Sequence, residues 1–397
     1  MILRDQFPIL QREINGHPLV YFDNAATTQK PLSVINAMNN YYTNSNANVH
    51  RAVHTLAGEA TEGYESCRTS LKNRFNADRA IITSGTTEAI NLVAHAWGRA
   101  NLADGDAIIL TEMEHHSDIV PWQMLAEEMN IELRYVPVQN DFTLDMELFE
   151  ASMKDVKLVC VVHISNVLGV CNPIEQIISI AKKNGAKVLL DAAQSAPHQL
   201  IDFKQIGADF MAFSAHKMCG PTGIGALLVS NEAFAEMKPF MGGGDMIETV
   251  SIHGSTYQTN EQKFEAGTPR IAEAIGWTEA LKWLDTIDLE KEHTRLIESA
   301  RWLATKLREM GMTVYGRHDE DDAAVVSFLH PTMNSEDLAH LLDARGFAVR
   351  TGHHCAQPLL DRLEISGTIR ASLYIYNTHE EVVSFIDCLT EILERFS

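Results

Sequence analysis

The chain has 397 residues, of which 45% are hydrophobic and 21% are charged, and this composition predicts a globular protein with a large core and room for a second domain. Its formal net charge of −21 at pH 7 argues against binding of nucleic acid or anionic membranes through a general basic surface, although it allows a local basic pocket. No apolar run approaches the roughly 20 residues of a membrane span, and residues 1–5 lack the apolar core of a signal peptide, so we expect a cytoplasmic protein.

Short apolar runs alternate with amphipathic segments from about residue 79 to residue 230. The expected strands are 80–83, 107–111, 133–136, 158–164, 188–190, 210–213 and 226–229. Helical patterns lie between several of them, at 88–97, 120–129 and 174–183. This alternation predicts a mostly parallel, seven-stranded sheet with helices on both faces. Ligands of such sheets bind beyond the carboxyl ends of the strands.

The last third of the chain predicts a smaller α+β unit. It contains two helices within 271–310, an acidic and solvated loop at 319–322, strands at 323–329, 348–350 and 368–373, a helix at 336–344 and a closing helix from residue 379. We therefore expect three parts: an N-terminal segment (1–20) that packs with the small domain, a large domain (21–285) and a small C-terminal domain (286–397).

A lysine and an aspartate end two neighbouring strands of the expected sheet. Asp191 follows the run 187–190, and Lys217 closes the motif Ser-Ala-His-Lys after the run 209–213. A pyridoxal phosphate (PLP) enzyme needs a lysine for the Schiff base and a carboxylate for the pyridinium nitrogen. A surface lysine and a capping aspartate would explain either residue alone, but the pairing favours the cofactor.

A phosphate site is expected where the run 81–83 passes through a turn of small residues into a helix. Free N–H groups at a helix N-terminus suit a phosphate, and Thr86 and Thr87 add hydroxyl donors. Ser214 and His216 would contact it from the other side. The alternative is an ordinary capping motif.

His115 follows the expected strand 107–111, where an imidazole can stack on a cofactor ring and exchange protons. A zinc site is the competing hypothesis. Adjacent histidines do not easily aim at one metal, and the sequence places no third ligand nearby, so we expect no metal site.

Cys355 lies on a glycine-containing loop with histidines before it and Arg350 at its start, an electropositive setting that lowers a thiol pKa and favours a nucleophile. The six cysteines are scattered, which is typical of reduced thiols. Cys67, Cys160 and Cys388 fit buried apolar positions, whereas the roles of Cys171 and Cys219 stay open.

Arg370 belongs to the expected strand 368–373. An arginine fork suits the α-carboxylate of an amino acid substrate, and a structural salt bridge is an equally good explanation of this residue alone.

Taken together, these residues resemble the class V, fold-type I PLP enzymes, and within them the group II (SufS-like) cysteine desulfurases. The resemblance runs nearly end to end, through ordered motifs at residues 21–28, 48–51, 84–88, 113–116, 121–122, 165–169, 191–194, 214–217, 242–244, 264–269, 350–355 and 370–372. The Arg-x-Gly-His-His-Cys form at 350–355 separates this group from group I, whose cysteine lies on a longer loop. Ala215, Cys171 and Arg270 depart from the usual residues, and Arg270 leaves the intersubunit contact less certain than the chemistry.

The resemblance implies a role for each matching residue. Lys217 would bind PLP as a Schiff base and move the Cα proton. The other cofactor contacts would come from Asp191 on the ring nitrogen, Gln194 on the ring hydroxyl, His115 stacked on the ring, Thr86, Thr87, Ser214 and His216 on the phosphate, and Thr268 from a second subunit. Asn166 and Arg370 would hold the substrate carboxylate, while His50, Arg51 and Arg350 would line the mouth of the site.

The implied reaction converts L-cysteine to L-alanine and leaves a persulfide on Cys355. The resemblance also implies a homodimer and a sulfur-accepting protein of the SufE or SufU type, which would supply iron–sulfur cluster assembly. Selenocysteine lyase is the nearest alternative, since a more acidic selenol departs with less help and Cys355 would then be dispensable. Transamination, β-elimination and a non-catalytic sulfur-carrier scaffold are further alternatives, although a scaffold has no use for Lys217, Asp191, His115 and Arg370 together.

Overall fold

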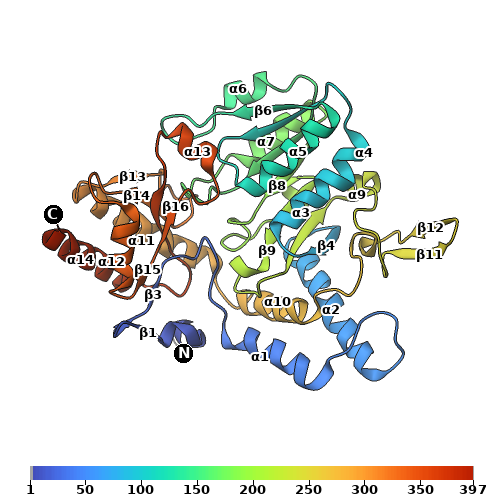
Figure 1. The fold of residues 1–397 in the computed structure, drawn as a ribbon, viewed down its shortest axis with the longest axis horizontal. Helices are drawn as coiled ribbons and strands as arrows, with labels where there is room; N and C mark the ends of the chain where they lie inside the picture. Colours follow the sequence, from blue (N-terminus) through green and yellow to red (C-terminus); the bar gives the residue numbers. More distant parts are fainter. Residues whose placement is uncertain (1–2, 397) are drawn as a thin grey trace.

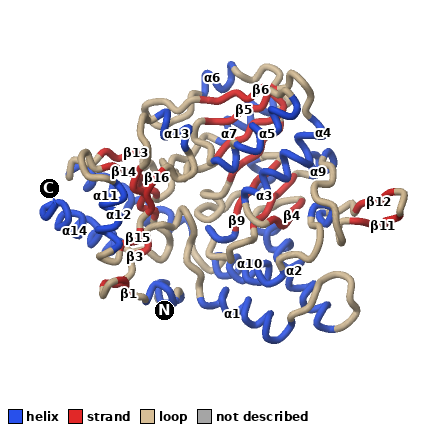
Figure 2. The backbone as a smooth tube through the Cα atoms, viewed as in Figure 1, coloured by secondary structure: helices blue, strands red, loops and turns tan. Residues whose placement is uncertain are grey.

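The structure is a computed structural model that describes residues 3–396 (Figure 1). Residues 1–2 and 397, which begin and end the expected N-terminal segment and small domain, lie outside the described residues. Figure 2 shows two groups of elements. The larger group is a set of strands covered by helices, and the smaller group, around β14 and α14, lies beside it.

Seven strands form the central sheet, in the order β4-β10-β9-β8-β7-β5-β6. Their bounds are β4 Arg79–Thr83, β5 Ala107–Thr111, β6 Glu132–Val136, β7 Val156–Val162, β8 Lys187–Asp191, β9 Phe210–Ser214 and β10 Gly225–Val229. All neighbours pair in parallel except β10, which runs antiparallel to both β4 and β9. The structure confirms the predicted mostly parallel, seven-stranded sheet.

Alternate residues of the strands face two different apolar layers. In β5, Ile108 and Leu110 face one layer and Ala107 and Ile109 face the other, as the two-residue period of a strand requires. One layer contains buried residues of α3 (Thr86–Leu92), α5 (Val120–Met129) and α9 (Asn231–Glu236), and the other contains those of α2 (Thr55–Arg74), α7 (Ile174–Lys183) and α10 (Ile271–Leu284). Burial on both faces explains why the strands are nearly continuous apolar runs.

Helices bound the sheet much as the sequence predicts. In α7, Ile174, Ile177, Ile178 and Ala181 are buried, which is the spacing of one helix face. The expected helix 88–97 instead divides into α3 and a wider turn, Val93–Gly98, before α4 (Arg99–Asn101). The other helices of this part are α1 (Leu32–Asn40), α6 (Met146–Ala151) and α8 (Phe203–Ile206).

A second, antiparallel sheet of four strands carries the C-terminal part, in the order β13-β14-β17-β16. The strands are β13 Thr313–Tyr315, β14 Val325–Leu329, β16 Arg350–Gly352 and β17 Thr368–Ser372, and the helices are α11 Leu289–Glu309, α12 Ser335–Asp343, α13 Gln357–Arg362 and α14 His379–Phe396. The expected strand 348–350 is split, because β15 (Phe347–Ala348) pairs with β3 (Val20–Tyr21) near the N-terminus before the chain enters β16. Two short strands, β1 (Glu13–Ile14) and β2 (His17–Pro18), precede β3.

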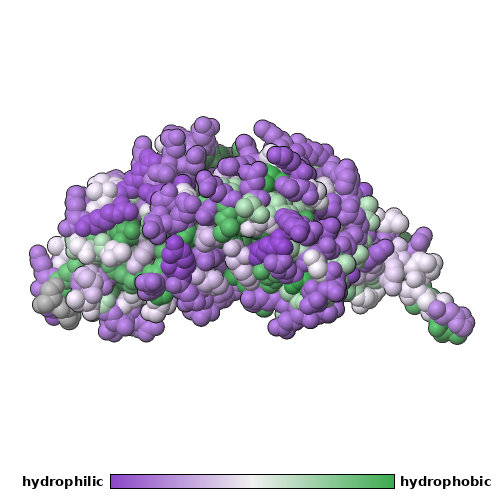
Figure 3. All heavy atoms as spheres, turned by 90° about the horizontal axis from the view of Figure 1, so that it is seen from above, coloured by the Kyte–Doolittle hydropathy of each residue, from purple (hydrophilic) through white to green (hydrophobic). Residues whose placement is uncertain are grey.

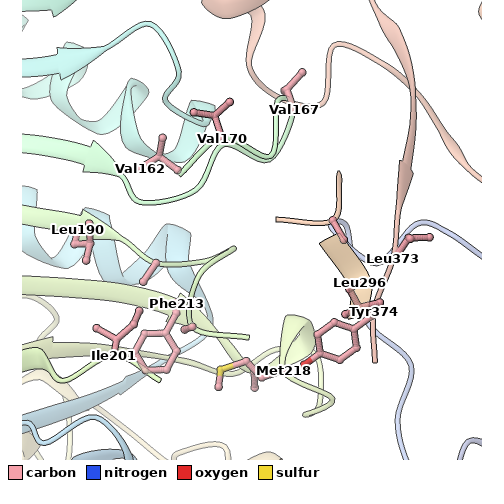
Figure 4. Packing of buried hydrophobic residues seen from close by; sticks show 14 of the residues in the cluster. Val162, Val167, Val170, Leu190, Ile201, Phe213, Met218, Leu296, Leu373 and Tyr374 are labelled. Atoms are coloured by element: carbon pink, nitrogen blue, oxygen red, sulfur yellow. The ribbon is translucent and has the colours of Figure 1, made fainter. Parts of the chain in front are cut away.

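One continuous apolar cluster joins the two sheets (Figure 4). Val162, Val167 and Val170 on the central-sheet side pack in the same cluster as Leu373 and Tyr374 after β17. The hydroxyl of Ser327 in β14 donates to the carbonyl of Val167 at 2.6 Å. The segment after β7 is therefore fixed from both sides, and this segment carries Asn166.

A hairpin that the sequence analysis did not predict, β11 (Ile247–Ser251) with β12 (Gly254–Tyr257), projects from the body (Figures 1 and 3). Ile252 at its tip has 94% of its surface exposed, and Val250 has 65%. Figure 3 shows apolar residues at the end of this arm. Among the helices of residues 3–396, none is long and apolar enough to cross a membrane.

A buried ion pair fastens α2 to the edge of the central sheet. The guanidinium of Arg68 donates to both carboxylate oxygens of Glu265 at 2.7 Å, and the backbone N–H of Ile82 in β4 donates to the same carboxylate at 2.8 Å. Tyr64 adds a hydroxyl donor at 2.9 Å. Both charged side chains are less than a tenth exposed, so this carboxylate is held by four donors and screened little by water.

Glu265→Gln should lower the free energy of unfolding by about 3 kcal/mol, because it removes the buried counter-charge of Arg68 and leaves the guanidinium only the more exposed carboxylate of Glu65. Urea unfolding followed by circular dichroism measures this change. The matched control is Glu128→Gln, which breaks the exposed Arg99–Glu128 pair and should cost less than about 1 kcal/mol. Equal effects of the two variants would show that burial does not strengthen the Arg68–Glu265 pair.

Candidate active site

A pocket of about 280 Å3 opens at the carboxyl ends of the central strands. It collects most of the predicted site residues, namely Thr86, Thr87, His115, Asn166, Asp191, Gln194, Ser214, His216, Lys217, Arg350, Cys355 and Arg370. They come from the loops after β4, β5, β7, β8 and β9 and from the second sheet. A larger cavity of about 920 Å3, lined by His163 and Cys171 among others, contains none of these residues. The chemistry of the lining, and not the volume, therefore identifies the candidate site.

Asp191, which is buried, and Lys217, which is partly buried, bring two charged groups to the lining of the pocket. Asp191 is 2% exposed and accepts the backbone N–H of Ala193 at 2.8 Å. Burial raises the pKa of Asp191, while the Ala193 hydrogen bond and the charge of Lys217 oppose that rise. Burial lowers the pKa of Lys217 to about 8, against the opposing effect of Asp191. A carboxylate with this burial suits a cationic ring nitrogen, and an amine with this pKa is readily available as a nucleophile.

The phosphate end of the pocket is built by contact between two loops. Ser214 Oγ accepts the backbone N–H of Thr86 at 2.8 Å and lies 2.7 Å from Thr86 Oγ1. A Cβ at Gly225 would lie 2.5 Å from Gly85 Cα and 2.6 Å from Phe213 O, so β10 approaches this turn as closely as only glycine allows. The donors Thr86, Thr87 and Ser214 all line the pocket. This close packing with hydroxyl and N–H donors fits the phosphate group of PLP.

Three buried side chains of the pocket lining have polar atoms without partners among residues 3–396, namely Nε of Arg370, Oδ1 of Asn166 and Nδ1 of His354. Arg370 is 2% exposed and donates to the carbonyl of Asn166 at 2.9 Å and to Asp23 Oδ1 at 3.2 Å. Burial lowers the pKa of Arg370 to about 10, and Asp23 opposes that shift. Arg370 therefore stays charged at neutral pH and retains a donor for a further acceptor, as recognition of a carboxylate requires.

His115 is neutral in this pocket. Burial, reinforced by the charge of Lys217, lowers the pKa of His115 to about 3. Its Nδ1 accepts the backbone N–H of Ser117 at 3.1 Å, and that hydrogen bond places the ring proton on Nε2. The ring can therefore stack on an aromatic cofactor while its outer nitrogen donates a hydrogen bond.

Two buried acids flank His115, and the sequence analysis did not select them. Glu114 and Asp118 are fully buried, and Glu114 Oε2 and Asp118 Oδ2 have no hydrogen-bond partner among residues 3–396. Thr111 donates to Glu114 at 2.7 Å, and the indole of Trp122 donates to Asp118 at 2.9 Å. Burial raises the pKa of both acids, and the charge of each raises the pKa of the other further, so the protonated forms are favoured in the fold. The sequence signal that could have identified this pair is two acids spaced four residues apart directly after the apolar strand 107–111.

Cys355 is partly exposed on the loop between β16 and α13. His354 and Cys355 have φ values of +52° and +57°, two consecutive non-glycine residues in the left-handed region. Each such residue costs on the order of 1–3 kcal/mol, so neighbouring contacts must hold this loop in place. Asn166 contributes one of them by donating to the carbonyl of His354 at 2.8 Å.

The structure brings His116, His353 and Cys355 together, with one ligand-type atom of each within 4.8 Å of the others. From the sequence we expected no third ligand-type residue near the adjacent histidines 115 and 116, whereas the structure places His353 and Cys355 beside His116. The backbone N–H groups of Cys355 and Gln357 donate to His353 Nδ1 and His116 Nε2, each at 3.0 Å. In a neutral ring the remaining nitrogen then carries the proton, so these rings present N–H donors and no free lone pair to a metal ion.

The remaining predicted residues lie outside the pocket. His50 contacts Glu65 at 3.0 Å, and Arg51 pairs with Asp245 at 2.7 Å. Thr268 lines a separate surface pocket near Tyr41 and Tyr42. These three residues are not brought to the site within one chain.

The residues with undecided roles also lie away from the pocket. Arg270 lies 3.4 Å from Glu88. Cys219 is fully buried, and Cys171 lines the larger cavity, where burial raises its pKa to about 12.

Comparison with known proteins agrees with this geometry. The family model described as aminotransferase class-V matches residues 20–385. A probable cysteine desulfurase of Halalkalibacterium halodurans is 47% identical over 398 residues, which cover 99% of this chain and 97% of that protein. The apo structure of a cysteine desulfurase from Thermococcus onnurineus NA1 is similar with a TM-score of 0.93 at 38% identity, over 98% of each chain. The cysteine desulfurase CsdA from Escherichia coli has a TM-score of 0.91 at 36% identity, over 98% of this chain and 97% of that one.

Asp118→Asn should stabilise the protein, and the gain should grow with pH. An acid whose pKa is raised on folding binds its proton more tightly in the folded state, so its burial costs more stability as the pH rises above the unfolded value. Asparagine is uncharged and avoids this cost. We expect a gain of roughly 1–3 kcal/mol near pH 9 and less near pH 6 in urea unfolding. A loss at both pH values would show that Asp118 is charged in the fold.

Gly225→Ala should weaken PLP binding, because the added Cβ would push the turn at Gly85 out of place. Overpacking of this kind costs about 1–3 kcal/mol, so we expect roughly tenfold or greater loss of affinity when the apoprotein is titrated with PLP. Gly58→Ala is the matched control, since a Cβ there meets no atom within 4 Å. Equal affinity of the two variants would contradict the assignment of this turn to the phosphate.

Proposed function

Because this chain belongs to the class-V aminotransferase family, together with relatives named cysteine desulfurase, we propose that it is a PLP-dependent desulfurase of the group II type that converts L-cysteine to L-alanine. In this proposal Cys355 receives the sulfur as a persulfide. The observation that carries the proposal is one pocket in which the thiol of Cys355 shares walls with Lys217, Asp191 and Arg370.

PLP supplies an electron sink that makes the Cα proton of a bound amino acid removable. The residues that would hold it are Asp191 and Gln194 at the ring, His115 on its face, and Thr86, Thr87, Ser214 and His216 at the phosphate. Lys217 would bind it covalently through Nζ. The buried Asp191 carboxylate would stabilise a positive charge on the ring nitrogen, because little water is present to screen the interaction.

Arg370 and Lys217 would have separate roles toward the substrate, carboxylate binding and proton transfer. Arg370 would hold the substrate carboxylate with its free donor, next to the amide of Asn166. Burial lowers the pKa of Lys217 to about 8, so near neutral pH its amine can both accept and return a proton. Lys217 is therefore the proposed group that removes the Cα proton.

Cys355 would complete the reaction by attack of its thiolate on the substrate sulfur. An S–S bond forms as the Cβ–S bond breaks, the electron pair of the broken bond stays with the carbon skeleton, and Cβ then takes up a proton. L-cysteine and an enzyme thiol thereby become L-alanine and an enzyme persulfide. The loop must bring the two sulfur atoms to roughly 3–3.5 Å for this attack, which explains why its conformation is constrained.

A second subunit would complete the mouth of the site. The predicted residues His50, Arg51 and Thr268 lie outside the pocket of their own chain, as expected for side chains that serve a partner. We propose a homodimer on this basis. The SufE- or SufU-type acceptor, the supply of iron–sulfur cluster assembly and the cytoplasmic setting rest on the family resemblance.

Cys355→Ala should still bind L-cysteine, seen as a change in the visible absorbance of the cofactor, but should lose sulfur transfer by at least roughly 100-fold. Alanine release and enzyme-bound persulfide are measured together. Cys171→Ala, the change of the other partly exposed cysteine, is the control and should leave both unchanged. Undiminished alanine formation without Cys355 would favour selenocysteine lyase, and pyruvate in place of alanine would indicate β-elimination.

A further inference from the structure

Two residues of the central-sheet side hold the loop that carries Cys355: Asn166, which donates to the carbonyl of His354 at 2.8 Å, and His116. His116 makes two contacts. Its backbone N–H donates to the carbonyl of Cys355 at 2.8 Å. Its ring Nε2 accepts the backbone N–H of Gln357, the first residue of α13, at 3.0 Å. Both hydrogen bonds lie on the C-terminal side of the Cys355 side chain, at the carbonyl of Cys355 and the N–H of Gln357, whereas the Asn166 contact lies on its N-terminal side. His116 therefore fixes the end of the segment that leads from the thiol into α13.

Two further hydrogen bonds are made within the loop itself. Cys355 N–H donates to His353 Nδ1, and Ala356 N–H donates to the carbonyl of His353, each at 3.0 Å. These bonds shape the turn but do not place it against the pocket. Because His354 and Cys355 are both in the left-handed region, a loop released from its outside contacts would relax toward more favourable backbone angles.

His116 also stands next to His115 in the chain, and the two rings face different parts of the site. His115 lines the pocket with Lys217, whereas the ring of His116 lies beside that of His353, with centroids 5.5 Å apart. The dipeptide thereby connects the proposed cofactor face to the sulfur-accepting loop over one peptide bond. The position of the Cys355 loop is therefore coupled to that of His115, the residue proposed to stack on the cofactor.

We propose that His116 is a positioning residue for sulfur transfer, which holds the Cys355 loop in its transfer conformation through the acceptor at Nε2. This inference rests on the proposed role of Cys355 as sulfur acceptor. It requires a ring that is neutral at Nε2. Burial and the neighbouring His353 lower the pKa of His116, which keeps that acceptor available at neutral pH.

The test compares two amides that differ by one methylene group. Glutamine at 116 can place its side-chain oxygen near the position of Nε2, whereas asparagine ends near the position of Nδ1 and falls short of Gln357. Both variants keep the backbone N–H that donates to Cys355. His116→Asn should slow persulfide formation about 10- to 100-fold, with little change in the absorbance response to L-cysteine binding, and His116→Gln should stay within about threefold of the unaltered protein.

A second measurement follows the loop without turnover. Alkylation of Cys355 by iodoacetamide, located by peptide mass spectrometry, should be at least about threefold faster in His116→Asn than in His116→Gln, because the released loop exposes the thiol. Equal alkylation and equal transfer rates in the two variants would overturn the proposal, as would equal slowing in both. If Cys355 is not the acceptor, Cys355→Ala leaves alanine formation intact while the alkylation difference persists, so the two proposals fail separately.

Discussion

The candidate site depends on a partly buried amine and a buried carboxylate at the carboxyl ends of neighbouring strands of the central sheet. Asp191 is the last residue of β8, and Lys217 follows the adjacent parallel strand β9, so the two lie at neighbouring carboxyl ends. Burial works against the charge of each, lowering the pKa of Lys217 and raising that of Asp191. The covering loops and the second sheet limit the access of water to these groups, which gives the lysine its reactivity and strengthens the attraction of the aspartate for a bound cation.

The second sheet contributes the groups that meet the substrate. Arg370 lies in β17 and Cys355 lies between β16 and α13, yet both face a pocket whose base belongs to the first sheet. A continuous apolar cluster and the Ser327–Val167 hydrogen bond fix the distance between the sheets. On the central-sheet side, His116 then holds the Cys355 loop at two backbone positions. Packing between the two sheets therefore brings Arg370 and the Cys355 loop to the pocket, and a few hydrogen bonds fix the position of the loop within it.

The sequence predicted what depends on local pattern. Strand runs such as 107–111 and 226–229 appear in the structure with the same bounds or within one residue, because burial on both faces makes them continuous and apolar. Asp191 and Lys217 were found because strand ends share an edge. The partnership of His116 with the Cys355 loop, and that of Glu114 with Asp118 against Trp122, depend on tertiary approach and have no fixed spacing in the sequence. The β11–β12 arm was missed because its residues are exposed, so it has no buried face from which a periodic pattern could be recognised.

The most direct test of this account is a single turnover of the PLP-loaded protein with L-cysteine, followed by mass spectrometry of the cysteine-containing peptides. The account predicts one additional sulfur atom on the peptide that carries Cys355 for each L-alanine released, and none on the peptide of Cys171. Release of L-alanine with the sulfur set free as sulfide, or found on another cysteine, would contradict it.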